Sequence, residues 1–259
     1  MTNIAVERPD TQAQAVWEAR SLAIVSLFAG RNECFGEWAH FLRTAELPPK
    51  TALYVVDNSG AREFSQMAQD QCQQIANDRS LLHLDYAIVG RPYAGAQNES
   101  YLTKARHQHV AQLYSSVLPR VTEDTVLTLE DDMQPTADTA RRLADELGYG
   151  KEIGVVAATY AMPHNEREVC AGDSCDGGWG RTPRWEEIPH APIDMGCVGG
   201  GCTLWANWAL QNSPIQLRWE RLLGWDAMLC LDVRRKGYKV RLHGGVRCGH
   251  HIHGRVKAA

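Results

Sequence analysis

Short apolar runs alternate with longer amphipathic segments along most of the chain. The apolar runs predict strands over Leu22–Leu27, Leu53–Val56, His83–Val89, Thr125–Leu129 and Ile153–Thr159. Apolar residues at helical spacing predict helices over Phe35–Leu42, Arg62–Ala76, Asn98–Val117, Thr136–Leu147 and Trp225–Lys236. Strands that alternate with helices indicate an α/β fold, with a mixed, mainly parallel sheet flanked by helices.

The alternation breaks in the second half of the chain. Ala161–Gly196 is rich in Gly, Pro and charge without periodicity, so we expect a long irregular segment that carries binding function. Strands are expected again at Cys202–Trp205 and near Val240. With a polar leader over residues 1–20 and no linker, one domain over residues 21–259 is the simplest organisation.

Composition indicates a globular protein with a buried core, since 44% of the 259 residues are hydrophobic. The early apolar run Leu22–Ala29 is far shorter than the roughly 20 residues of a membrane span, so a cytoplasmic protein is expected. Its eight cysteines are expected as reduced thiols. Zinc at the pairs Cys170/Cys175 and Cys197/Cys202 is the alternative, although their spacing is unusual for structural zinc.

Charge is unevenly distributed along the chain. Residues 216–259 hold ten Lys or Arg and three Asp or Glu, a balance of +7, so the total of −4 leaves −11 for the remainder. A basic segment beside an acidic one suits a polyanionic ligand such as a diphosphate, a nucleic acid or an anionic lipid. A solvated basic face explains the same pattern equally well.

Three consecutive carboxylates, Glu130, Asp131 and Asp132, directly follow the apolar run Thr125–Leu129. Adjacent acids repel one another, so holding them together at a strand end is costly unless a cation or hydrogen-bond donors offset the charge. A divalent metal, Mn or Mg, held by one or two carboxylates and by substrate phosphates would do so. An acidic turn that caps the following helix is the alternative.

Other candidates follow later strands and open a later helix. Asp57 ends an apolar run and is placed to contact a base or ribose, although Asp-Asn-Ser also favours a turn. Asp226 opens the last helix, as a cap or as an exposed general base. His250, His251 and His253 close the chain, and neutral imidazole is a good ligand for Mn or Zn.

Glycines precede the strand at Cys202–Trp205. Gly199, Gly200 and Gly201 permit close approach of the main chain to a ligand, or simply form a turn. The chain contains neither G-x-x-x-x-G-K-[ST] nor G-x-G-x-x-G after a strand. This speaks against P-loop and dinucleotide-binding enzymes.

The order of these motifs resembles the family 2 inverting glycosyltransferases of the GT-A fold, over roughly Ser21 to His253. The matching segments are SLFAGRNE, VVDNS, TKARHQ, LEDD, GGGCTLW, GWDAMLCLDVRRKGYKV and VRCGHH. The resemblance implies a donor half over about residues 21–135 and an acceptor half over about 136–259. It implies donor-binding roles for Ser26, Phe28, Asp57, Arg106, Glu130, Asp131 and Gly200.

The same resemblance implies that Asp132 binds the metal and that Asp226 is the catalytic base. Trp225 stands where the family usually has Glu, and Met228 where it has a second Asp. His250 and His251 both match the strand whose histidine can ligate the metal, and the register does not choose between them. The expected activity is metal-dependent transfer of a sugar from a nucleotide-diphosphate donor, with inversion.

Two alternatives share the expected fold. One is a nucleotidyltransferase that makes nucleotide sugars, and the other is a noncatalytic carbohydrate or nucleic-acid binding protein. The absence of a membrane segment disfavours a membrane-embedded polymer synthase. Acceptors that remain open are soluble glycans, lipid-linked sugars, proteins, small molecules and modified bases in DNA.

Overall fold

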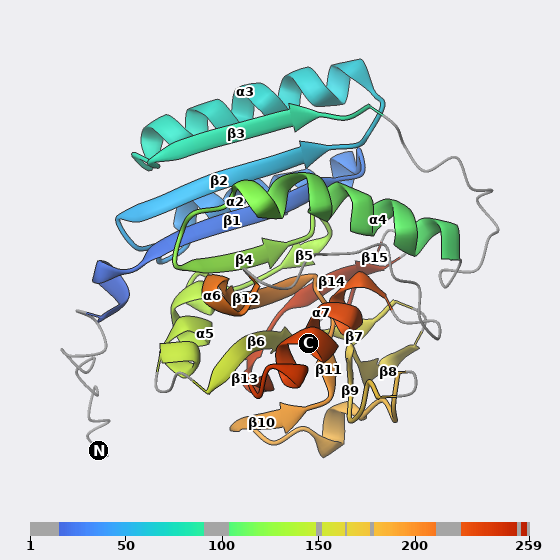
Figure 1. Ribbon diagram of the computed structural model, residues 1–259. Helices are drawn as coiled ribbons and strands as arrows, with labels where there is room; N and C mark the ends of the chain where they lie inside the picture. The colour runs from blue at the N-terminus through green and yellow to red at the C-terminus, as the bar shows by residue number, and fades with distance from the viewer. Residues whose placement is uncertain are drawn as a thin grey trace, which may run out of the picture.

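The computed structural model is built on one eight-stranded sheet, in the order β10-β13-β6-β12-β4-β1-β2-β3 (Figure 1). Six of its strands, β1, β2, β3, β4, β6 and β13, lie parallel to at least one neighbour, whereas β12 and β10 pair antiparallel with theirs. The α/β class with a mixed, mainly parallel sheet is therefore confirmed. The structure describes residues 16–90, 104–148, 152–163, 165–176, 179–210, 224–252 and 255–257.

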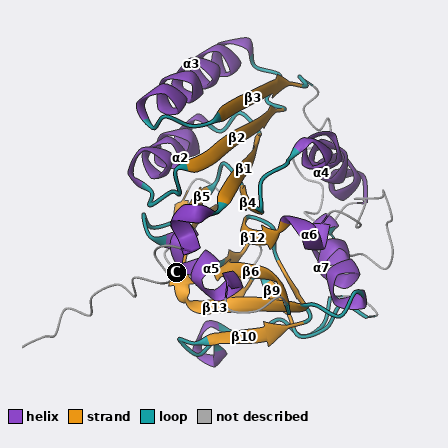
Figure 2. Ribbon diagram, turned by 60° about the vertical axis from the view of Figure 1, so that its left-hand side comes forward, coloured by secondary structure: helices purple, strands orange, loops and turns teal. Residues whose placement is uncertain are grey.

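The first half of the sheet has the regular alternation that the sequence predicts. Its parallel strands are β1 (Ser21–Phe28), β2 (Lys50–Asp57), β3 (His83–Ile88) and β4 (Thr125–Leu129). Its helices are α2 (Asn32–Thr44), α3 (Arg62–Asp78) and α4 (Lys104–Val117). Figure 2 shows α2 and α3 on one face of these strands and α4 on the other. The part of the expected α4 helix before Lys104 lies outside the described residues.

The second half contains the antiparallel strand that makes the sheet mixed. β12 (Cys202–Ala206) lies between β4 and β6 (Ile153–Thr159), antiparallel to both. β13 (Lys239–Arg247) runs parallel to β6, and β10 (Pro192–Met195) closes the edge. The helices here are α5 (Thr139–Gly148), α6 (Asn207–Leu210) and α7 (Trp225–Arg235).

The segment Ala161–Gly196, expected to be irregular, contains several short elements. They are β7 (Ala161–Met162), β8 (Asn165–Val169), β9 (Ala171–Gly172), the 3₁₀ turn Trp185–Glu187 and β10. β7 pairs with β8, β9 pairs with β11 (Cys197–Val198), and β10 joins the main sheet. The expectation was wrong because strands of two to five residues are too short to show alternation.

Two strands of a small second sheet bring distant residues to the end of β4. β5 (Met133–Gln134) pairs antiparallel with β14 (Gly249–Ile252), which also pairs with β15 (Arg255–Lys257). The pairing joins Gly249 to Gln134 and His250 to Met133. The acidic segment and the C-terminal histidines therefore lie side by side, as the colours of β5 and β14 in Figure 1 also show.

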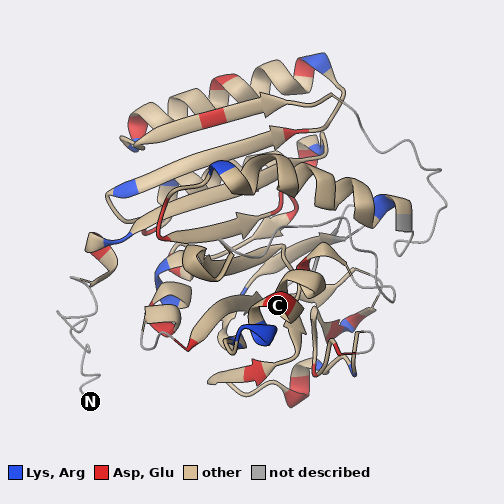
Figure 3. Ribbon diagram, viewed as in Figure 1, with Lys and Arg blue, Asp and Glu red and all other residues tan. Residues whose placement is uncertain are grey.

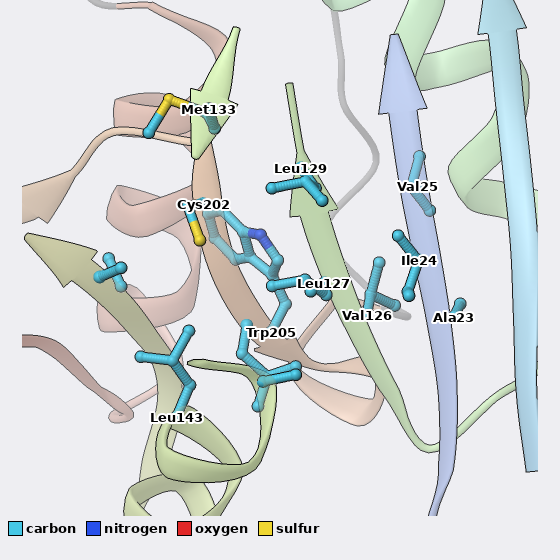
Figure 4. Close-up of a cluster of buried hydrophobic side chains, with 14 of the residues drawn as sticks. Ala23, Ile24, Val25, Val126, Leu127, Leu129, Met133, Leu143, Cys202 and Trp205 are labelled. Atoms are coloured by element: carbon cyan, nitrogen blue, oxygen red, sulfur yellow. The ribbon is translucent and has the colours of Figure 1, made fainter. Parts of the chain in front are cut away.

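The core beneath these strand ends is apolar and fully buried. Figure 4 shows Trp205 of β12 beside Leu127 of β4 and Cys202, with Leu129 and Met133 towards the end of β4. All five side chains are at most 1% exposed. The indole of Trp205 donates to Thr128 Oγ1 at 3.0 Å, which satisfies its polar atom in the core. β4 is thus held rigidly up to the residue before the acidic segment.

Two further expectations concern membranes and cysteines. No helix in the described part of the chain is both long and apolar enough to span a membrane. All eight cysteines are free thiols. Cys175 contacts Cys197, and Cys202 contacts Cys248, but no three of the candidate cysteines in the described part of the chain come together as ligands of one metal ion.

Candidate functional site

The loop after β1 brings Arg31 against the acidic segment. Gly30 has φ +82°, a left-handed conformation that glycine adopts readily, and a Cβ there would lie 2.8 Å from Ser59 Cβ. Arg31 then begins α2 as its N-cap residue. Its Nη1 lies 3.2 Å from Asp131 Oδ1 and forms a closer ion pair with Asp132 Oδ2. Arg31 thus bridges two of the three predicted acids.

Burial makes the charge of this segment costly. The side chains of Asp131 and Asp132 are only 3% and 9% exposed. The amide of Ala29 donates to Asp131 Oδ2 at 2.8 Å, but burial still raises the pKa of Asp131 to about 7. Burial, reinforced by the charge of Asp132, raises the pKa of Glu130 to about 8. Three acids therefore stand against the single guanidinium of Arg31 in the red segment after β4 in Figure 3, and the raised pKa values of Glu130 and Asp131 are the result of that crowding and burial.

His250 is the second partner of Asp132. Its Nε2 lies 3.6 Å from Asp132 Oδ2, and its Nδ1 lies 2.9 Å from the carbonyl oxygen of Ala161. Burial opposes ionisation of Asp132, but the contact with His250 and the charge of Arg31 outweigh it and lower the Asp132 pKa. Burial opposes ionisation of His250, but the contact with Asp132 outweighs it and raises the His250 pKa, so the charged ring is favoured, with Nδ1 directed to the Ala161 carbonyl and Nε2 to Asp132. Loss of the Nε2 proton would leave a lone pair beside Asp132 Oδ2 for a metal ion.

His251 is placed differently from its neighbour. Its Nε2 lies 2.7 Å from Gln134 Nε2, and only its amide reaches the acidic segment, donating to the carbonyl oxygen of Asp132 at 2.8 Å. Successive side chains of a strand point to opposite faces, so β14 directs one histidine to Asp132 and the other away. Of the two histidines left open by the sequence, the geometry favours His250.

These residues fit a divalent cation, although no group of three or more His, Cys, Asp or Glu side chains within the described ranges forms a ready metal site. Asp132 Oδ1 is buried and has no hydrogen-bond partner among the described residues. A carboxylate oxygen and an imidazole nitrogen are both metal ligands, and Mn or Mg sites commonly take their remaining ligands from water and phosphate. Two protein ligands suffice for such a site.

Asp226 is held at the start of α7 by main-chain donors. Its Oδ2 accepts from the Gly200 amide at 3.0 Å, and its Oδ1 accepts from the Ala227 amide at 2.8 Å. Burial raises the pKa of Asp226, and these bonds and the nearby His107 ring oppose that rise. A carboxylate with a raised pKa, oriented by fixed donors, has the properties of a general base.

Gly200 and Trp225 position Asp226. A Cβ on Gly200 would lie 2.3 Å from the indole of Trp225, so only glycine permits this approach. The Trp225 ring stacks on Tyr114 of α4 at 3.9 Å between ring centroids. Trp225, which stands where the resembled family usually has Glu, therefore locks α7 against α4 and the glycine turn.

The glycine turn also connects Asp226 to the acidic segment. The Glu130 amide donates to the Gly201 carbonyl at 2.8 Å, and the Gly201 amide donates to the Tyr160 hydroxyl at 2.9 Å. Gly200 and Gly201 are consecutive, so one peptide joins the residue that binds Asp226 to the residue that binds Glu130. The predicted metal-binding and catalytic carboxylates thus belong to a single site.

Three predicted donor-binding residues have side chains occupied within the protein. Ser26 is fully buried and accepts a hydrogen bond from the Trp38 indole at 3.0 Å. Phe28 is also fully buried, with its ring 4.7 Å from that of Trp38. Asp57 is fully buried and accepts from the Ser59 amide at 2.9 Å and the Tyr86 hydroxyl at 3.0 Å. These side chains support the strand ends, and a role for them in donor binding stays a prediction.

Arg106 and His107 lie in the first turn of α4. Arg106 is partly exposed, and the charges of Arg106 and Asp226 both act on the His107 ring. Sequence reasoning selected Arg106 but missed His107, as it missed Arg31. No local pattern marks either, because each reaches the site only through the packing of its helix or loop.

Comparisons with known proteins agree with this geometry. No protein-family model matches the chain, and no curated protein matches it in sequence. Solved structures that do match include three glycosyltransferases in complex with nucleotides, nucleotide sugars or Mn²⁺. A mannosyltransferase from Pyrobaculum calidifontis, PcManGT, with GDP-Man and Mn²⁺, matches with TM-score 0.56 and 12% identity. The match covers 90% of this chain and 63% of that protein.

Two further structures give the same result. GalNAc-T7 with UDP, GalNAc and Mn²⁺ matches with TM-score 0.59 and 12% identity, over 91% of this chain and 45% of that one. TarS of S. aureus with UDP-GlcNAc matches with TM-score 0.57 and 10% identity, over 88% and 57%. The chain spans about half to two thirds of these proteins. At identities this low, the structural similarity establishes the fold alone. That fold is the one of GT-A glycosyltransferases.

Proposed function

We propose that this protein is a metal-dependent glycosyltransferase that moves a sugar from a nucleotide-diphosphate donor to an acceptor hydroxyl, with inversion. The observation that carries the proposal is the connection of Asp226 to Glu130 through the Gly200–Gly201 peptide, because Glu130 begins the acidic segment whose Asp132 pairs with His250. It supports a site in which a cation-binding pair and a general base lie near one another at the strand ends of a GT-A sheet.

Asp132 and His250 would hold the divalent ion, which when bound neutralises charge on the diphosphate leaving group. Arg31 and Arg106 contribute positive charge near the same strand ends. Asp226 removes the proton from the acceptor hydroxyl, whose oxygen forms the new bond to the anomeric carbon as the bond to the diphosphate breaks. Attack from the face opposite the diphosphate inverts that carbon.

The test is a panel of UDP, GDP and dTDP sugars incubated with the protein, Mn²⁺ and candidate acceptor alcohols. We expect release of the nucleoside diphosphate together with a glycosylated acceptor. Pyrophosphate release from a nucleoside triphosphate and a sugar phosphate would instead indicate a nucleotidyltransferase. Binding of donor without release under any of these conditions would indicate the noncatalytic alternative.

A further inference from the structure

Arg31 occupies the position at which a cation would compensate the acidic segment. Its Nη1 contacts Asp131 Oδ1 at 3.2 Å and is closer still to Asp132 Oδ2. The same Oδ2 lies 3.6 Å from His250 Nε2. One carboxylate oxygen is therefore shared by Arg31 and by the histidine that is placed to bind metal. A divalent ion held by Asp132 and His250 would repel the guanidinium at such short range.

The surroundings of Arg31 allow its side chain to move from the acids to the solvent. The side chain is 33% exposed, whereas its partners Asp131 and Asp132 are 3% and 9% exposed. Arg31 makes no side-chain capping bond to α2. Because the turn at Gly30 sets the main chain, rotations within the side chain alone can carry the guanidinium from the acids to the nearby solvent.

A diphosphate is the ligand that would receive the displaced side chain. Guanidinium groups bind phosphate oxygens through two parallel hydrogen bonds, with the same fork geometry that they use on carboxylates. In the proposed function the diphosphate shares the metal with Asp132, so it lies within reach of the loop after β1. Arg31 then exchanges one anionic partner for another.

We propose that Arg31 is an exchangeable counter-ion: it pairs with Asp131 and Asp132 in the free protein and moves to the donor diphosphate when metal binds. Arg31 opposes binding of the metal when no diphosphate is present, but it stabilises the complex in which metal and diphosphate are bound together. Metal and donor binding become mutually dependent. The second step rests on the proposed function, whereas the competition with metal rests on the contacts of Arg31 and Asp132 themselves.

The experiment measures Mn²⁺ binding by electron paramagnetic resonance, with Mn²⁺ alone and with Mn²⁺ plus inorganic pyrophosphate. For Mn²⁺ alone, we expect Arg31→Gln to bind about 10-fold more tightly than wild type, within the usual range of coupling between sites. With pyrophosphate present, we expect the variant to bind Mn²⁺ about 10-fold more weakly than wild type, because the diphosphate loses its guanidinium.

Arg141→Gln is the matched control. Arg141 also bridges two carboxylates, with Nε 2.5 Å from Glu46 Oε2 and Nη1 3.2 Å from Asp145 Oδ2, and its side chain is 30% exposed. None of these residues belongs to the candidate site. Arg141→Gln should bind Mn²⁺ as wild type does under both conditions, and a change equal to that of Arg31→Gln would contradict the proposal.

The remaining outcomes separate this proposal from the proposed function. Mn²⁺ affinity in Arg31→Gln equal to or weaker than wild type, without pyrophosphate, overturns the counter-ion role alone. Tighter Mn²⁺ binding with no sugar transfer from any donor supports the competition and contradicts the enzyme. No Mn²⁺ binding by any variant overturns both. Should Arg31→Gln not fold, Arg31→Lys must bind Mn²⁺ alone more tightly than wild type, since an ammonium is more strongly hydrated than a guanidinium and so leaves the buried acids more readily.

Discussion

Asp131 and Asp132 after β4 are buried and Asp226 at the start of α7 is half-buried, and these two regions are stabilised by different groups. Asp131 and Asp132 are compensated by charged side chains, Arg31 and His250. Asp226 is compensated by the main-chain amides of Gly200 and Ala227. A side-chain cation can be exchanged for a metal, whereas a main-chain donor cannot leave. One region is therefore suited to bind ions, and the other to hold a base in one orientation.

The largest effect should come from removing the charge that binds the cation. Asp132→Asn is expected to weaken Mn²⁺ binding at least about 100-fold, since loss of an anionic ligand exceeds the effect of outer contacts. Isothermal titration with Mn²⁺ measures it. Asp145→Asn, which removes another carboxylate paired with an arginine, should leave Mn²⁺ affinity unchanged. Equal losses in both variants would contradict the site.

Steric disruption of the glycine turn tests the second region. Gly200→Ala places a methyl group 2.3 Å from the Trp225 indole, so we expect it to lower the free energy of unfolding by about 1–3 kcal/mol. Gly36→Ala is the control, because its methyl group meets nothing within 4 Å on helix α2 and should stabilise by about 0.4–1 kcal/mol. Urea unfolding measures both, and equal effects would refute the packing argument.

Substitution of the two histidines of β14 tests which of them binds metal beside Asp132. His250→Gln is expected to weaken Mn²⁺ binding about 10-fold, as one of two protein ligands is replaced by a weaker one. His251→Gln should change it little, because His251 contacts Gln134 and directs only its amide to Asp132. The same titration compares them. A larger loss in His251→Gln would reverse the assignment.

The smallest effect concerns the pH dependence of the base. Burial raises the pKa of Asp226, and the base acts only when ionised, so transfer should rise with pH above the ordinary Asp value of about 3.9. His107 opposes that rise only when charged, and burial lowers its own pKa. In His107→Gln, the acidic limb of the pH–rate profile should therefore shift to higher pH by less than about one unit. A shift of the acidic limb to lower pH in this variant would contradict the coupling between His107 and Asp226.

The first half of the sheet could be predicted because its strands are continuous buried runs between amphipathic helices. β4 has the predicted limits, β1 extends one residue beyond them at each end, and β2 begins three residues earlier and ends one later, with nearly every residue buried. The acidic segment was found for the same reason, since three charges after a buried strand stand out locally. The short strands of the second half lack any such contrast.

Contacts between distant segments explain what the sequence could not show. Arg31 was missed because its role depends on residues about 100 positions away. The choice of His250 over His251 depends on the pairing of β14 with β5, which no local pattern encodes. The sequence motifs predicted that Ser26, Phe28 and Asp57 bind the donor. In the structure these side chains are buried in the core, and Ser26 and Asp57 accept hydrogen bonds from other residues of the protein.

The central claim is that a general base and a metal-binding pair act on one donor. Asp226→Asn tests it most directly, with donor binding and single-turnover sugar transfer measured on the same sample in the presence of Mn²⁺. The account predicts donor affinity close to that of wild type and transfer reduced about 10²- to 10⁴-fold. Undiminished transfer, or loss of donor binding together with transfer in a folded protein, would contradict it.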